Sequence, residues 1–231
     1  AMTPRTVTVG DIDIATGRPF AVIAGPCQIE SLDHALMMAE RIASACEAAG
    51  RRFIYKSSYD KANRSSHETA RGIGMDEGLR ILAAVKERFG CPVLTDVHDA
   101  GQCAPAAEVA DVIQIPAFLC RQTDLLEAAG AAGVPINIKK GQWMAPEDMA
   151  GAVEKVRQAR GIEDGGVAVT ERGTFHGYGD LVVDMRSFVR MREAARAPTI
   201  FDGTHSVQRP GMGSGVSGGD PEFIVPLVRG A

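Results

Sequence analysis

The chain has 231 residues, a formal net charge of −4, 45% hydrophobic residues and 23% charged residues. These values indicate one globular domain, 1–231, and exclude a general polyanion binder, so we expect no nucleic-acid partner. No apolar run approaches the ~20 residues of a membrane span, and we expect no membrane partner. Five cysteines without a disulfide-scaffold spacing, and no secretory signal, favour a reducing cytoplasm.

The first predicted element is a β-hairpin, in which Val7–Val9 and Ile12–Ile14 flank Gly10-Asp11. We assign it to an N-terminal extension, residues 1–19. Seven short apolar segments then alternate with amphipathic ones. The predicted strands are Phe20–Ala24, Phe53–Lys56, Pro92–Thr95, Val112–Ile115, Pro135–Lys139, Val167–Thr170 and Thr199–Phe201. The predicted helices are Ser31–Ala49, Met75–Phe89, Gln122–Ala132, Pro146–Arg160, Met185–Ala195 and Pro221–Arg229.

Regular alternation of strands and helices predicts parallel strands with helical crossovers, an α/β fold. An open doubly wound sheet is one alternative, but no glycine-rich nucleotide loop follows the first strand. Polar residues follow nearly every strand instead, as in a (β/α)8 TIM barrel, whose chemistry lies at the carboxyl ends of the strands. A closed barrel needs an eighth strand. Either one strand is not recognisable in the sequence or, as we expect, the eighth βα unit is missing from this chain.

The loop after the second strand, 56–66, is rich in cations and serines, with Lys56, Lys61 and Arg64 opposed only by Asp60. Such a loop is either a solvated turn or a site for phosphate or carboxylate oxygens. Lys139 and Lys140 end another apolar strand and are hard to explain as structural residues, and Arg172 follows the next strand. Five cations on one rim, the three loop cations with Lys139 and Arg172, indicate two phosphorylated groups, or a phosphate with a carboxylate.

Other strand ends add potential ligands and acid–base groups. Cys27 follows the first strand, where a cysteine is either a small buried filler or a thiolate metal ligand. Asp96 ends the third strand and His98 lies two residues later, while Gln114 is in the fourth strand. The seventh strand is followed by His205. The glycine-rich segment Gly211–Gly219 is either a flap over the site or an ordinary loop.

Several of these segments together resemble the 3-deoxy-D-manno-octulosonate 8-phosphate synthases. They are Gly25-Pro26-Cys27, Lys56-Ser57-Ser58, Lys61-Ala62-Asn63-Arg64-Ser65-Ser66, Thr95-Asp96-Val97-His98, Gln114–Leu119, Lys139–Gln142 and Thr204–Gln208. The Lys61–Ser66 block is the specific one, because the related 3-deoxy-D-arabino-heptulosonate 7-phosphate synthases carry Lys-Pro-Arg-Thr there. Both families condense phosphoenolpyruvate with a phosphorylated aldose on a (β/α)8 barrel.

The resemblance implies a role for each residue. Lys61, Lys139 and Arg172 would hold phosphoenolpyruvate, with Lys56 nearby. Asn63, Arg64 and Ser65 would hold arabinose 5-phosphate. Arg121 and Phe118 would reach across the interface of a homotetramer. The residues implied for catalysis are Lys61, Asp96 and His205, and those implied for substrate binding are Lys56, Ser57, Asn63, Arg64, Ser65, Gln114, Phe118, Arg121, Lys139, Arg172 and Gln208.

Cysteine at position 27 implies the metal-dependent branch, with Cys27 and His205 as ligands of Zn, Fe or Mn and the remaining ligands beyond Ala231. The implied function is synthesis of 3-deoxy-D-manno-octulosonate 8-phosphate in the cytoplasm, for lipopolysaccharide. Two alternatives stay open. One is a heptulosonate phosphate synthase that uses erythrose 4-phosphate, and the other is a catalytically incomplete fragment that acts only in binding or assembly.

Overall fold

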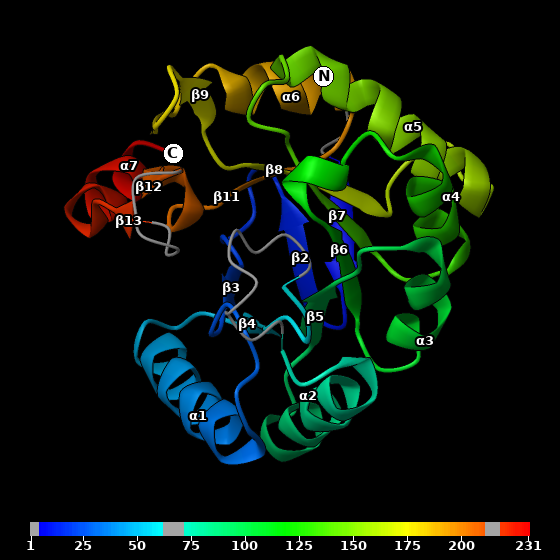
Figure 1. Ribbon diagram of the computed structural model, residues 1–231, viewed down its shortest axis with the longest axis vertical. Helices are drawn as coiled ribbons and strands as arrows, with labels where there is room; N and C mark the ends of the chain where they lie inside the picture. The colour runs from blue at the N-terminus through cyan, green and yellow to red at the C-terminus, as the bar shows by residue number, and fades with distance from the viewer. Residues whose placement is uncertain (1–4, 62–71, 211–217) are drawn as a thin grey trace.

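Seven parallel strands form the centre of the molecule, as shown by a computed structural model that describes residues 5–61, 72–210 and 218–231. The sheet runs in the order β11-β8-β7-β6-β5-β4-β3, and it curls so that the helices surround its outer side (Figure 1). The strands are β3 (Val22–Ala24), β4 (Phe53–Lys56), β5 (Val93–Asp96), β6 (Val112–Ile115), β7 (Ile136–Lys139), β8 (Val167–Glu171) and β11 (Thr199–Phe201). The seven predicted strands and their parallel arrangement are confirmed, and the curled sheet is consistent with a TIM-like barrel.

The helices follow the strands in chain order. They are α1 (Leu32–Ala48), α2 (Met75–Phe89), α3 (Cys103–Ala107), α4 (Thr123–Ala131), α5 (Met149–Arg160), α6 (Ser187–Ala195) and α7 (Ile224–Gly230). The Ser31 hydroxyl caps α1 by accepting a hydrogen bond from the His34 backbone amide. The predicted starts at Pro146 and Pro221 are 3-10 turns that lead into α5 and α7. Sequence reasoning missed α3, because five residues are too few for a clear helical period.

In the described part of the chain, three antiparallel strand pairs lie outside the main sheet. β1 (Thr6–Val9) pairs with β2 (Ile12–Ala15), and their buried Val7, Val9 and Ile12 belong to a cluster with Ile54, Leu94, Val112 and Ala168 of the main sheet. The other two pairs, which the sequence did not predict, are β9 (Thr174–His176) with β10 (Asp180–Val182), and β12 (Gln208–Arg209) with β13 (Gly218–Gly219). Most of the glycine-rich segment, 211–217, lies outside the described residues.

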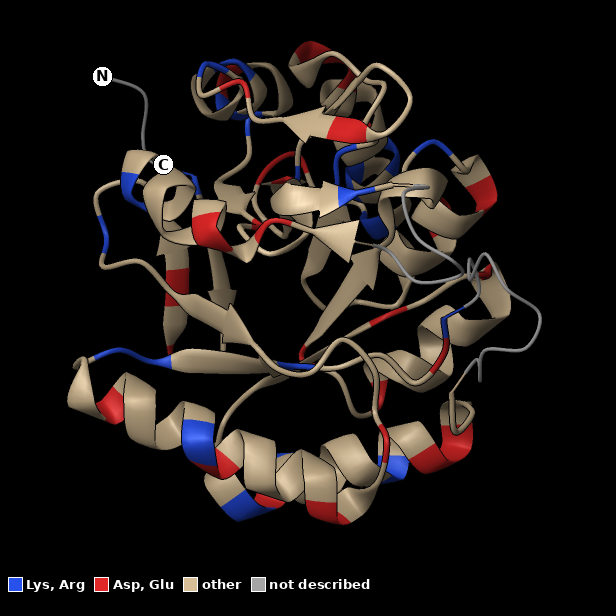
Figure 2. Cartoon of the chain, turned by 60° about the vertical axis from the view of Figure 1, so that its left-hand side comes forward, with Lys and Arg blue, Asp and Glu red and all other residues tan. Residues whose placement is uncertain are grey.

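Two apolar clusters fill the space between the sheet and its helices. The larger includes Ile113, Ile138 and Val169, and the smaller includes Leu82 and Val93. Basic and acidic residues are interspersed on the outer helices (Figure 2). Among the helices in the described ranges, none combines the length and apolar character needed to span a membrane.

Gly25 lies against the backbone of the neighbouring strand, where a Cβ would come within 1.8 Å of the Lys56 carbonyl oxygen. We expect Gly25→Ala to lower the free energy of unfolding by about 1–3 kcal/mol or more, because the two strand ends must separate. Gly151→Ala is the control, since a Cβ there meets nothing within 4 Å and alanine favours the α5 helix. Urea denaturation measures both variants, and equal stabilities would contradict the prediction.

Candidate active site

A cavity of about 250 Å³ lies at the carboxyl ends of the parallel strands. Both edge strands contribute to it, β3 through Ile23 and Ala24 and β11 through Ile200 and Phe201. Five residues predicted from sequence also line it, namely Cys27, Lys56, Gln114, Lys139 and His205. The fold therefore brings residues 178 positions apart in the chain to one central cavity, where the Cys27 Sγ lies 3.5 Å from the His205 Nε2.

Cys27 is exposed, so its interpretation as a buried filler is wrong. The contact with His205, with help from the charges of Lys56 and Lys61, lowers the pKa of Cys27 to about 7, although the protein atoms around the cavity partly desolvate the thiol and oppose this shift. The other ring nitrogen of His205, Nδ1, lies 2.7 Å from the Asp202 Oδ2. A carboxylate on one imidazole nitrogen orients the other nitrogen as a ligand, which is the usual support of a metal-bound histidine.

Cys27 and His205 fit two positions around one divalent ion, because their ligand atoms converge and the thiol ionises readily. Within residues 5–61, 72–210 and 218–231, no group of three or more His, Cys, Asp or Glu side chains is arranged to hold a metal. The described residues therefore supply a pair of potential ligands with an orienting carboxylate.

A second group is centred on Asp96, which is buried at the end of β5. The Ser58 hydroxyl donates to it, the His98 Nε2 lies 3.3 Å from its carboxylate, and the Lys61 Nζ donates to the Ser58 Oγ at 2.8 Å. Burial opposes the charge of Asp96, but these hydrogen bonds and the charges of Lys56 and Lys61 hold its pKa well below the usual range. Asp96 is therefore an anion that balances part of the positive charge.

Lys139 and Arg172 are buried cations at the ends of β7 and β8. Lys139 forms an ion pair with Asp202, and the Arg172 Nη2 donates to the Gln208 Oε1 at 2.8 Å. Burial lowers the pKa of Lys139, and Lys56 and Arg172 lower it further, while Asp202 raises it. The Arg172 Nη1 is buried without a hydrogen-bond partner among the described residues. A buried guanidinium nitrogen with no acceptor is suited to an anionic ligand.

Ser57, Gln114 and Lys140 are held by the protein itself. The Ser57 hydroxyl donates to the Pro26 carbonyl at 2.7 Å, and Gln114 accepts from the Asn137 amide at 3.0 Å. The Thr170 hydroxyl donates to Asn137 at 2.7 Å, which completes a row across three strands. Lys140 is fully buried on the other side of the strand from Lys139, so the expectation that it is not structural is wrong.

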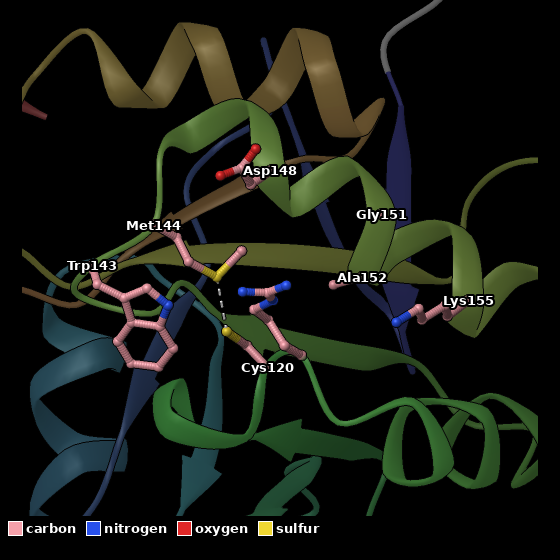
Figure 3. Close-up of a pocket in the computed structure, with 8 residues that line it drawn as sticks. Cys120, Trp143, Met144, Asp148, Gly151, Ala152 and Lys155 are labelled. Carbon is pink, nitrogen blue, oxygen red and sulfur yellow. Dashed lines mark hydrogen bonds between the residues drawn. The ribbon is translucent and has the colours of Figure 1, made fainter.

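A second cavity, of about 360 Å³, lies between the β6 and β7 loops and α5 (Figure 3). Arg121 lines it with Trp143 and Lys155, so Arg121 is not in the central cavity of its own chain. Phe118 is 50% exposed and stacks on Trp143, with ring centroids 6.1 Å apart. These two predicted residues thus form a separate surface beside the central site.

Residues 3–230 match the family described as the DAHP synthetase I family. This chain belongs to that family. Three relatives, each named 2-dehydro-3-deoxyphosphooctonate aldolase, come from Citrifermentans bemidjiense, Rickettsia bellii and Campylobacter jejuni. Their identities are 54%, 51% and 55%, over 98%, 98% and 91% of this chain. The matched regions cover 82%, 81% and 80% of those relatives.

In this member of the DAHP synthetase I family, sequence reasoning missed Ser58, Asn137, Thr170 and Asp202 as site residues. Ser58, Thr170 and Asp202 lie at or just beyond the carboxyl half of a parallel strand, which is the signal that could have found them, whereas Asn137 lies in the amino half of β7. Asp202 matters most, because it contacts both Lys139 and His205. Three predicted residues, Asn63, Arg64 and Ser65, lie outside the described residues.

Proposed function

We propose that the chain condenses phosphoenolpyruvate with arabinose 5-phosphate, giving 3-deoxy-D-manno-octulosonate 8-phosphate and phosphate for lipopolysaccharide biosynthesis. Relatives at 51–55% identity carry the corresponding name. The structural observation behind the proposal is a group of four cations at one end of the barrel-like sheet, in which Lys139 is close enough to interact with Lys56, Lys61 and Arg172. Four cations exceed the two carboxylates, Asp96 and Asp202, so the site favours anionic substrates.

We assign phosphoenolpyruvate to Lys61, Lys139 and Arg172, with Lys56 nearby. The unpartnered Arg172 Nη1 supports this assignment, because a carboxylate or phosphate oxygen satisfies it. Asp96 and Gln114 line the centre, and Ser57 and Gln208 support it through their hydrogen bonds to Pro26 and Arg172. The sugar phosphate is assigned to Asn63, Arg64 and Ser65 on the resemblance of the Lys61–Ser66 block.

The mechanism follows from the charges of the two substrates. Carbon 3 of the enol attacks the aldehyde of the sugar, and a new carbon–carbon bond forms as the aldehyde oxygen takes up a proton. Cationic character develops at carbon 2, where water adds and loses a proton, and phosphate leaves by carbon–oxygen cleavage. The cations hold two anions that repel each other in reactive contact, which lowers the barrier through orientation and charge stabilisation.

We propose a divalent metal, Zn, Fe or Mn, held by Cys27 and His205 with further ligands. The 3.5 Å approach of the Cys27 sulfur to the His205 Nε2 and the Asp202 contact with Nδ1 support this assignment. When bound, the ion supplies a Lewis acid at the centre of the site. His205, held by Asp202, keeps its Nε2 directed toward that centre.

We propose a cytoplasmic homotetramer of chains with a TIM-like barrel fold. The exposed Phe118–Trp143 stack and the position of Arg121 beside it support a role for this surface in the assembly. All five cysteines are free, as suits a reducing compartment. The edge strands β3 and β11 face one cavity, which supports closure of the sheet.

An assay with two aldoses tests the proposal. We expect phosphate release and product formation from phosphoenolpyruvate with arabinose 5-phosphate and divalent metal, at a kcat/KM at least tenfold above that with erythrose 4-phosphate. The opposite preference would establish the heptulosonate alternative. Calorimetric binding of phosphoenolpyruvate without turnover on either sugar would establish the binding-only alternative.

A further inference from the structure

Behind the central cavity lies a buried ion pair, Lys140 with Glu171, and neither residue is among those that line the cavity. Both side chains are fully buried, and the Lys140 Nζ lies 3.7 Å from the Glu171 Oε1. Each residue is the immediate chain neighbour of a site cation, since Lys140 follows Lys139 and Glu171 precedes Arg172. Side chains alternate along a strand, so the pair lies on the opposite side of β7 and β8 from those cations.

Lys140 fixes the loop that follows β7. Its Nζ donates to the Gly141 and Met144 carbonyls at 3.3 and 3.4 Å, and to the Thr174 hydroxyl at 3.2 Å. Its backbone amide donates to the Thr170 carbonyl at 2.9 Å. One side chain therefore connects the end of β7 to its own loop and to the start of β9.

Glu171 fixes the chain at the end of β8. Its Oε1 accepts from the Gly173 amide at 2.7 Å, and its Oε2 accepts from the Ser187 hydroxyl at 2.5 Å. Arg172 lies between these anchored positions. Gly173 has a φ of +91°, a conformation that glycine adopts readily. The hydrogen bond from its amide to the Glu171 carboxylate therefore fixes the turn directly after Arg172.

The pair also balances charge. Burial lowers the pKa of both Lys140 and Arg172, and the charge of Arg172 lowers that of Lys140 further, while the charge of Glu171 raises both. Without Glu171, the buried Lys140 ammonium would face the Arg172 guanidinium without its carboxylate partner. Without Lys140, the buried Glu171 carboxylate would lose its ammonium partner and would draw Arg172 toward itself. Either loss displaces the cation that is assigned to the anionic substrate.

We propose that the Lys140–Glu171 pair is a positioning device, which holds Lys139 and Arg172 in the arrangement that binds the anionic substrate. The substrate class rests on the proposed function, and the positioning role rests on the contacts of the pair. Neither residue touches substrate. Their effect is on the direction and spacing of the two neighbouring cations.

Calorimetry with phosphoenolpyruvate tests the proposal on the full chain. We expect Lys140→Met and Glu171→Gln each to weaken binding by roughly 10- to 100-fold, the range expected when groups in a site shift by about 1 Å. The KM for phosphoenolpyruvate should rise by a similar factor, while the KM for the sugar changes by less than about threefold. Because a single change leaves a buried charge unpaired, the charge-neutral double variant Lys140→Met/Glu171→Gln is measured as well. The double variant should bind phosphoenolpyruvate at least as tightly as whichever single variant has the lower affinity.

Arg157→Met is the matched control. Arg157 is another buried cation, and its guanidinium donates to the Gly165, Ala195 and Arg196 carbonyls near the amino end of β8. Its loss should lower stability and leave the affinity for phosphoenolpyruvate within about threefold of wild type. Equal losses of affinity in Arg157→Met and the two test variants would overturn the positioning role, as would test variants that bind like wild type.

The measurements distinguish a failure of the proposed function from a failure of the positioning role of the Lys140–Glu171 pair. If wild type binds phosphoenolpyruvate but makes no product, the reaction is wrong and the binding constants still decide the role of the pair. If wild type does not bind phosphoenolpyruvate, the function is wrong, and inorganic phosphate becomes the probe. Weaker phosphate binding in Lys140→Met and Glu171→Gln, but not in Arg157→Met, then supports positioning, and unchanged binding overturns it.

Discussion

Replacing Arg172 by alanine is expected to raise the apparent constant for phosphoenolpyruvate by about 10- to 150-fold. The change removes a charge-assisted contact worth roughly 1.5–3 kcal/mol. Arg172 is the informative position because its Nη1 is buried with no acceptor among the described residues, while its Nη2 is held by Gln208. Steady-state kinetics with each substrate varied in turn measure the effect. The constant for the sugar should change little.

Two further variants separate the substrates. Lys139→Ala should also weaken phosphoenolpyruvate use, with a loss of stability, because its buried partner Asp202 loses an ion pair and keeps the contact with His205. Arg64→Ala should show the opposite pattern and raise the apparent constant for the sugar. If all three variants changed both constants equally, the assignment of cations to two substrates would be incorrect.

Chelation is expected to abolish turnover, and a divalent ion is expected to restore it. Cys27→Ala should lower both metal content and kcat, because the thiolate anchor is lost. The His205 contact favours this role by lowering the pKa of Cys27 to about 7. Elemental analysis and activity assays of the same protein preparations measure the two losses together.

Cys103→Ala is the matched control for the metal prediction. Cys103 is 1% exposed in the apolar cluster outside the sheet, and burial raises the pKa of its thiol to about 11. Its replacement should cost packing energy and leave metal content and chelator sensitivity unchanged. If the metal-free wild-type protein were fully active, the prediction that the enzyme depends on a metal would be wrong.

Much of the fold was predictable from sequence, because it depends on local patterns. Parallel strands that are buried on both faces require continuous apolar runs, and the crossovers between them require amphipathic helices. These patterns located all seven strands of the main sheet. The position of polar residues after the strands also located Lys56, Lys139 and His205 in one cavity.

Short or irregular elements were not predictable in the same way. The hairpin of β9 and β10 and the five-residue α3 carry too few residues for a period to be visible. The sequence analysis also gave the same interpretation to two adjacent residues at a strand end, and for one of them it was wrong. Lys139 and Lys140 look equivalent in sequence, yet one lines the cavity and the other is buried behind it, because successive side chains point to opposite faces.

The sequence by itself determined the order of strands and helices, the end of the sheet that carries the chemistry, and the excess of cations there. Only the tertiary structure decided which groups meet: Cys27 with His205, Asp202 with both Lys139 and His205, and Lys140 with Glu171. These partners come from different strand ends or from either side of the same turn. Their contacts depend on the curl and register of the sheet, which no local pattern of residues encodes.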